Sequence, residues 1–308
     1  MYKRQCQGSA QAGWLEARRA DVLPVPYAHV VFTLPQSLAP LALQNPKVVY
    51  DLLLRTVART LQEIASNPRH LGARLGFFAI LHTWGQTLVH HPHVHCVVPA
   101  GGLAEDGCTW KPCRPGFFLP VRVLSRLFRG KFLAGLTQAF RDGRLDLHGR
   151  LVPYRHPAAF NRLLHEARAT EWVVYAKPPF DAPEHVLKYL ARYTHRVALS
   201  NHRLVHVDDE TVTFRYKDYR SRRPRSQTLP LGEFCRRFLL HVLPKGFVRI
   251  RSYGFLANGT RARLLPRCRD ALGQPQTITM PETEDGEGFL ELLPRGLRRC
   301  PHCKKGLL

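Results

Sequence analysis

Two histidines separated by one residue, His93 and His95, are the first candidates for chemistry in this sequence. They lie in a short run rich in valine, and on a β-strand alternate side chains point to the same face. One face would then present two imidazoles about 7 Å apart, a spacing at which both can bind one divalent cation. Such a cation polarises a phosphoryl oxygen while a nucleophile attacks the phosphorus. Val94, Cys96 and Val98 would point to the core.

Two tyrosines one helical turn apart, Tyr189 and Tyr193, form the second candidate pair. Residues 184–196 have helical periodicity, and the two phenols would lie side by side at the border between an apolar and a basic face. Their hydroxyls can therefore reach one site together. The basic face carries Lys188, Arg192 and Arg196.

Each pair alone is more typical of a structural role. A chain with 16 histidines contains some His-x-His by chance, and tyrosines at such a border are common helix anchors with a buried ring and a wet hydroxyl. Combined, the pairs provide a nucleophile and an electrophilic metal. A tyrosine that attacks a phosphodiester forms a phosphotyrosine ester and releases a deoxyribose hydroxyl, which conserves the bond energy for strand transfer. Because the phenol ordinarily has a pKa of about 10, we expect help from the metal and from Lys188 or Arg192.

The elements that must position these residues follow from hydrophobic periodicity and turn residues. Strands are predicted at 29–35, 74–83, 93–98, 172–175 and 211–216. Helices are predicted at 10–21, 48–64, 120–142, 157–168, from about 183, and at 231–242. His90 and His91 are expected in a loop before Pro92. This order predicts an α+β fold, with an antiparallel sheet that carries helices on one face.

The charge of the chain indicates a polyanionic partner, because 46 Lys and Arg against 23 Asp and Glu leave a net charge of +23. Cations interleaved with aromatics between 215 and 225 are expected to bind single-stranded DNA. The alternative is a solvated hairpin face. No apolar run is long enough for a membrane span, and the start lacks the apolar segment of a signal peptide, so we expect no membrane partner and a cytoplasmic location. The predicted DNA-binding cations are Arg215, Lys217, Arg220, Arg222, Arg223 and Arg225.

The eight cysteines are too sparse for a disulfide scaffold. Cys300 and Cys303 have zinc-knuckle spacing, but one such pair supplies half of a tetrahedral site. Further zinc ligands would have to come from Cys268, His302 or Cys6. The alternative is a pair of free thiols.

Two runs in this sequence resemble motifs of one family. Residues 91–102 (HPHVHCVVPAGG) and 188–196 (KYLARYTHR) are similar to the HUH and paired-tyrosine motifs of rolling-circle insertion-sequence transposases, which belong to the HUH superfamily and are related to insertion-sequence common-region elements. Flanking stretches at 26–35, 214–220 and 252–258 also resemble that family. The resemblance covers most of the chain, from about residue 6 to 268.

The resemblance implies an HUH-endonuclease-like fold and a DNA strand transferase. Such an enzyme nicks and rejoins single-stranded DNA at transposon ends through a 5′-phosphotyrosine intermediate and uses Mg²⁺ or Mn²⁺. In this chain His93 and His95 would be metal ligands, and Tyr189 and Tyr193 the nucleophiles. It also implies a bacterial protein associated with the nucleoid. A third metal ligand is usual in the superfamily, and the candidates are Gln86, His90 and His195.

Members of the family begin with a cysteine-rich zinc-binding domain, of which Cys6-Gln7 resembles the last ligand. We therefore expect a shortened chain with Zn²⁺ at its terminal cysteines. Its expected parts are a zinc-domain remnant (1–24), the catalytic domain with the two-tyrosine helix (25–200), a basic DNA-binding extension (201–280), and a tail that begins with an acidic linker at 281–288 and ends in the CxxC pair (281–308).

Two other functions fit the same residues. A plasmid rolling-circle replication initiator or a relaxase would share the site and differ in the DNA that it nicks, and the flanking motifs favour the transposase. A non-enzymatic, zinc-dependent DNA-binding protein would form no covalent product with DNA.

Overall fold

The computed structural model describes residues 13, 18–116, 118–180, 198–218, 221 and 223–273, without the side chains of 177–180. The predicted helix from about 183, most of the predicted helix at 10–21 and the predicted linker at 281–288 lie outside these residues.

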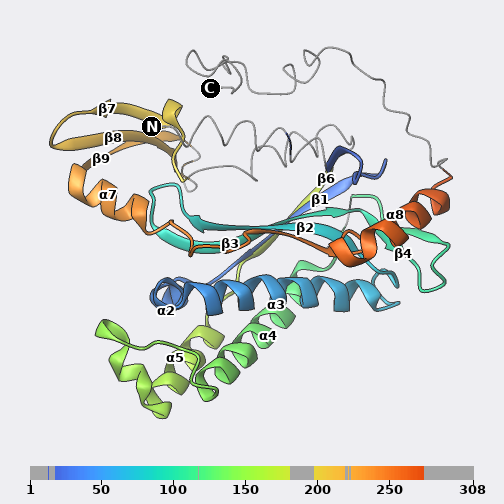
Figure 1. Cartoon of the computed structure of the whole chain (residues 1–308), viewed down its shortest axis with the longest axis horizontal. Coiled ribbons are helices and arrows are strands. Elements are labelled where there is room, and N and C mark those ends of the chain that lie inside the picture. The colour runs from blue at the N-terminus through green and yellow to red at the C-terminus, as the bar shows by residue number, and fades with distance from the viewer. Residues whose placement is uncertain are drawn as a thin grey trace.

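A five-stranded antiparallel sheet forms the centre of the fold (Figure 1), with the strand order β10-β2-β3-β1-β6. The predicted α+β fold with an antiparallel sheet is thus confirmed. The predicted strands at 29–35, 74–83, 93–98 and 172–175 are present with shifted ends. The five strands are β1 (Tyr27–Thr33), β2 (Gly76–Trp84), β3 (His90–Pro99), β6 (Val174–Phe180) and β10 (Ile250–Gly254).

Helices cover one face of this sheet (Figure 1). α3 begins at Pro46, whose missing N–H is not needed at the first helical position, and ends just before the Asn67-Pro68 pair. Its apolar residues recur at helical spacing and are buried against the sheet. The predicted helices at 48–64, 120–142 and 157–168 are confirmed. The helices on this side are α2 (Ala39–Gln44), α3 (Pro46–Ser66), α4 (Val121–Arg141) and α5 (Pro157–Ala169).

Among the described residues, those that cover the opposite face of the sheet lie over one part of its length. There α8 (Asn258–Ala271) and residues 22–25 bury a second apolar cluster that includes Phe78, Ile80 and Val97. Further along the same strands, this face carries histidines instead of apolar side chains. The hairpin of β4 (Gly101–Leu103) and β5 (Trp110–Pro112) lies beside α8.

The prediction that His90 and His91 lie in a loop is wrong, because both belong to β3. The pairing of β2 with β3 is irregular between the His82–His93 and Trp84–His90 pairs. Pro92 lies at this irregularity, where a missing N–H costs no regular ladder bond. Its carbonyl accepts a hydrogen bond from the Leu34 N–H at 3.1 Å. The proline therefore interrupts the ladder without ending the strand.

A smaller unit, here called the hairpin module, runs from the short helix η3 (Asn201–Arg203) to His241. Its strands form a three-stranded antiparallel sheet, and α7 packs on β8 and β9. The predicted strand at 211–216 and helix at 231–242 correspond to β8 and α7. The elements are β7 (Leu204–Val207), β8 (Thr211–Lys217), β9 (Pro224–Pro230) and α7 (Leu231–Leu239).

The hairpin module is attached to the turn between β2 and β3. Three consecutive backbone carbonyls of residues 86–88 accept hydrogen bonds from Arg203 Nη2 (2.5 Å), Arg237 Nη1 (3.3 Å) and His241 Nε2 (3.1 Å). Leu88 is completely buried in the core of the module, although its φ is +61°, a left-handed conformation that is uncommon for residues other than glycine. The turn that joins two central strands therefore also holds the module.

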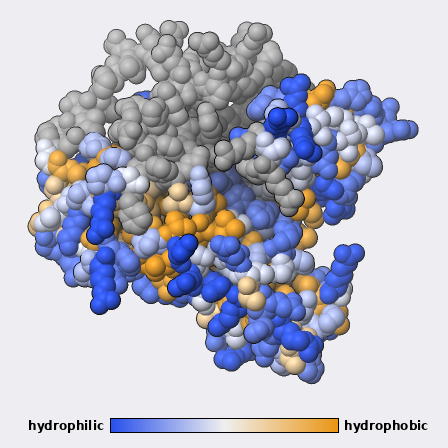
Figure 2. Space-filling model, turned by 180° about the vertical axis from the view of Figure 1, so that it is seen from behind, coloured by the Kyte–Doolittle hydropathy of each residue, from blue (hydrophilic) through white to orange (hydrophobic). Residues whose placement is uncertain are grey.

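β10 lies in the sequence after the hairpin module but pairs with β2 in the central sheet. The predicted extension at 201–280 thus contains one strand of the central sheet and the helix that covers part of it. Among the described helices, none has the length and apolar character needed to cross a bilayer. Figure 2 shows a largely hydrophilic surface, in which hydrophobic residues gather along the middle of the face in view.

Candidate metal centre

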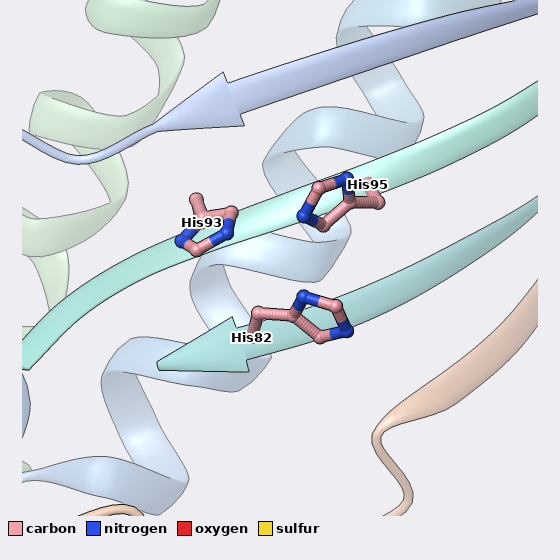
Figure 3. A group of neighbouring side chains, drawn as sticks. All are labelled: His82, His93 and His95. Atoms are coloured by element: carbon pink, nitrogen blue, oxygen red, sulfur yellow. The ribbon is translucent and has the colours of Figure 1, made fainter. Parts of the chain in front are cut away.

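Three histidines from two adjacent strands converge on the face of the sheet opposite helices α2 to α5 (Figure 3). His93 and His95 come from β3, and His82 near the end of β2 lies directly opposite His93 in the register. One ring nitrogen from each histidine lies within 4.8 Å of the other two. The ring centroids of His93 and His95 are 4.9 Å apart, and those of His82 and His95 are 4.5 Å apart. These three residues are called the histidine cluster below.

The expected alternation along β3 is present. Val94, Cys96 and Val98 lie in the main core, on the side of the helices, while His93 and His95 share the other face. The two rings lie closer than the expected spacing of about 7 Å, because the side chains lean toward one another from a common face. Alternate positions of a single strand therefore supply two members of the cluster.

His93 is held in one tautomer. Its Nδ1 lies 2.6 Å from the carbonyl oxygen of His91, and because a carbonyl can only accept, Nδ1 carries the proton and Nε2 the lone pair. Burial lowers the pKa of His93 to about 4. The imidazole is therefore neutral at neutral pH, which is the form that binds a metal ion.

His82 and His95 are buried and have ordered neighbours. The ring of His82 stacks on Trp84 with centroids 4.6 Å apart, which fixes its orientation. His95 Nδ1 lies 2.8 Å from the Nε2 of His29, a buried residue of β1. Each ring of the cluster is thus oriented by a contact outside the cluster.

His82 was not among the predicted metal ligands. Its signal in the sequence is a histidine at alternate spacing from Phe78 and Ile80 in an otherwise apolar strand. That signal becomes useful only with the strand register, which places His82 opposite His93.

Two of the predicted third ligands lie outside the cluster. His90 points to the helical side, where its Nε2 is 2.8 Å from the hydroxyl of Tyr50, and burial lowers its pKa to about 4. Gln86 lies in the β2–β3 turn, where its backbone carbonyl accepts a hydrogen bond from Arg203 and its side-chain Oε1 accepts one from the Lys217 N–H at 3.5 Å. The third candidate, His195, is outside the described residues.

The remaining predicted residues divide between the described and the undescribed parts of the chain. On β8, Arg215 and Lys217 are exposed on the face opposite the buried Phe214, whereas Arg225 on β9 pairs with Tyr216 on the other face. Arg223 is exposed. Cys268 is buried among apolar residues, which raises the pKa of its thiol to about 12. The predicted residues outside the described part are Tyr189, Tyr193, Lys188, Arg192, Arg196, Arg220, Arg222, Cys6, Cys300, His302 and Cys303.

Comparison with known proteins identifies the family. Residues 76–263 match the Y2_Tnp family, described as "Putative transposase", and residues 4–34 match the Zn_Tnp_IS91 family, described as "Transposase zinc-binding domain". The first match covers more than half of the chain. The chain belongs to the Y2_Tnp family of transposases, and the predicted membership of the rolling-circle transposases is confirmed.

Two relatives are similar over most of this chain. It is 55% identical over 307 residues to "Putative transposase y4qJ" of Sinorhizobium fredii, covering 98% of this chain and 77% of the relative. It is 31% identical over 271 residues to the transposase for insertion sequence element IS801 of Pseudomonas savastanoi pv. phaseolicola, covering 87% of this chain and 63% of that protein. Among solved structures, the conjugative relaxase TrwC in complex with OriT DNA, without metal, has a TM-score of 0.30 and 20% identity over 36% of this chain and 43% of that chain.

Proposed function

We propose that this transposase nicks and rejoins single-stranded DNA at transposon ends, with Tyr189 and Tyr193 as nucleophiles and a divalent cation bound by His82, His93 and His95. The observation that carries the proposal is the convergence of three imidazoles on one face of the sheet. The tyrosines are proposed on the motif at 188–196, whose residues lie outside the described part.

The histidine cluster fits a divalent cation. Two nitrogens bound to one ion at about 2.1 Å lie roughly 3 to 4 Å apart, so nitrogens within 4.8 Å of one another need to approach only slightly. His93 is neutral with its lone pair on Nε2. Three protein ligands leave positions for phosphate oxygens. When bound, the cation supplies Lewis-acid polarisation of the phosphate; Mg²⁺ or Mn²⁺ is the proposed ion.

The proposed reaction is a transesterification. The phenolic oxygen of Tyr189 or Tyr193 attacks the phosphorus, an O–P bond forms, and the bond from phosphorus to O3′ breaks, releasing a 3′-hydroxyl. The 5′-phosphate stays on the tyrosine until another 3′-hydroxyl attacks it and frees the phenol. Lys188 or Arg192 is proposed to stabilise charge on the phosphate. Exposed Arg215 and Lys217 are proposed to hold the DNA strand next to the cluster.

The adduct assay tests this proposal directly. Full-length protein is incubated with single-stranded DNA carrying an element end, labelled at its 3′ end because the tyrosine keeps the 3′ segment. With Mn²⁺ we expect a labelled covalent band, and with EDTA none. The double variant Tyr189→Phe, Tyr193→Phe should give no band, while the matched control Tyr154→Phe, half-buried against the helical core, should keep it. No adduct with the unchanged protein, or an adduct in the double variant, contradicts the proposal.

The role of His82 is tested separately. His82→Ala should lower adduct formation at least about 100-fold, as expected for loss of a metal ligand, whereas His90→Gln on the opposite side of the sheet should leave it within a few-fold of the unchanged protein. If His82→Ala forms the adduct at the normal rate, His82 is not a ligand. Cys6, Cys300 and Cys303 remain predicted zinc ligands, which the match of residues 4–34 to a zinc-binding domain supports for Cys6.

A further inference from the structure

His29 contacts the histidine cluster from the neighbouring strand. It lies on β1, only 4% exposed, and no motif in the sequence assigns it a role. In the β1–β3 register His29 is opposite Val97, and His95 is opposite Val31, so both histidines lie on the same face as diagonal neighbours. This register brings His29 Nε2 to 2.8 Å from His95 Nδ1.

The two imidazoles are joined edge to edge. Their planes differ by 3° and their centroids are 5.1 Å apart. Rings packed face to face keep their atoms roughly 3.5 Å or more apart, so a nitrogen pair at 2.8 Å places both rings in a common plane. Both the N–H bond and the lone pair of an imidazole point within the ring plane. The contact is therefore a well-directed hydrogen bond.

One proton serves this bond, and its position decides which nitrogen of His95 has a lone pair. If His95 Nδ1 donates, the neutral ring has its lone pair on Nε2. If His29 donates, His95 carries its proton on Nε2 and cannot bind a cation there. Figure 3 shows one ring nitrogen of His95 directed toward His93 and His82. Only the arrangement in which His95 Nδ1 donates leaves a lone pair on Nε2 for a cation in the histidine cluster.

We propose that His29 is a positioning residue whose Nε2 accepts a hydrogen bond from the Nδ1–H of His95 and so fixes the tautomer and the ring orientation in which His95 Nε2 binds the cation. The inference rests on the metal centre of the proposed function. The same arrangement occurs at His93, where the carbonyl of His91 is the acceptor. Both ligands on β3 thus donate a hydrogen bond from Nδ1–H. The acceptor is a backbone carbonyl for His93 and a side chain of β1 for His95. Partners of this kind typically change metal affinity 10- to 100-fold.

Metal titration of the full chain tests the proposal. Mn²⁺ binding is measured by calorimetry for the unchanged protein, His29→Leu, His29→Gln and the control His165→Leu, which removes an exposed histidine on α5. His29→Leu has no acceptor and should raise the Kd about 10- to 100-fold. His29→Gln offers an amide oxygen and should recover most of the loss. If His29 only filled space, His29→Leu would bind Mn²⁺ as tightly as the unchanged protein, and His29→Gln would have no advantage over it.

The outcomes separate the two proposals. Equal affinities of the unchanged protein and His29→Leu overturn the role of His29 and leave the metal centre intact. No Mn²⁺ binding by the unchanged protein overturns the metal centre itself.

A second measurement does not depend on the folding of any His29 variant. Nitrogen NMR of the metal-free, unchanged protein reports the tautomer of each neutral histidine, with the His95 signals assigned from His95→Gln. The proposal requires the proton on Nδ1 of His95. A proton on Nε2 overturns the proposal even if Mn²⁺ binds normally.

Discussion

His90 illustrates how one buried side chain can make the stability of this protein depend on pH. Its Nε2 contacts the Tyr50 hydroxyl on the helical side of β3, and burial lowers its pKa to about 4. The unfolded chain binds a proton on this histidine near its ordinary pKa of about 6.5, whereas the folded chain stays neutral to lower pH. The contribution of His90 to the free energy of unfolding is therefore fully present above pH 6.5 and decreases as the pH falls toward 4.

The prediction for His90 is that His90→Gln has a weaker pH dependence of its unfolding free energy. Measured by urea denaturation at pH 7.5 and 4.5, the difference between the two pH values should shrink by up to about 3 kcal/mol. The control His165→Gln, exposed on α5, should leave the difference unchanged. If His90→Gln has the same pH dependence of the unfolding free energy as the unchanged protein, His90 does not cause that dependence.

The predictability of the site differs residue by residue. His93 and His95 were predictable because strand alternation alone puts them on one face. His82 and His29 were not, because their approach depends on the registers of β2 and β1 against β3, which the spacing of residues along one strand does not encode. The hydrogen bond at His95 Nδ1 further depends on the orientation of two rings, which no spacing encodes.

The β2–β3 turn joins the two strands that carry the histidine cluster, and it also holds the hairpin module. Leu88→Ala should remove the side chain that fills the core of the module, at a cost of about 2–5 kcal/mol to that contact. By hydrogen exchange we expect faster exchange of amides in β8 and α7 and unchanged protection in α3. The neighbouring Val89→Ala, exposed in the structure, is the control. Equal protection of β8 in Leu88→Ala and the unchanged protein would show that the module is held by other contacts.

The elements that were predicted well have long, strongly periodic sequences. α3 and α4 each bury one apolar stripe, and the helical spacing of these apolar residues predicts both helices from the sequence. β10 does not, because its half-polar sequence Ile-Arg-Ser-Tyr-Gly becomes a strand only through pairing with β2. Pro92 misled the prediction because the irregular pairing that accommodates it depends on the register between β2 and β3, which the proline alone does not indicate.

At the scale of the whole molecule, the net charge of +23 makes salt-sensitive DNA binding an expectation for every variant that keeps the fold. The hairpin module divides its cations between two faces. Arg215 and Lys217 are exposed on one, while Arg225 on the other is paired with Asp218 at 3.3 Å. A cation already neutralised by a carboxylate contributes less to phosphate binding.

The prediction is that the double variant Arg215→Ala, Lys217→Ala binds single-stranded DNA more weakly and with a flatter dependence on salt. Loss of two phosphate contacts should reduce the log–log salt slope by about 1.4, whereas Arg225→Ala should change it less. Fluorescence anisotropy at several salt concentrations measures both. Identical slopes for the double variant and the unchanged protein would remove β8 from the DNA path.

The attachment of the hairpin module has a consequence for how such proteins can diversify. Arg203, Arg237 and His241 bind backbone carbonyls, which every sequence offers, and Leu88 alone contributes a buried side chain from the turn. Residue 87 can therefore vary without weakening this attachment, whereas Gln86 also accepts a hydrogen bond from the Lys217 N–H through its side-chain Oε1 at 3.5 Å. A different module could therefore take its place on this sheet, provided that it brings three hydrogen-bond donors and a pocket for one leucine.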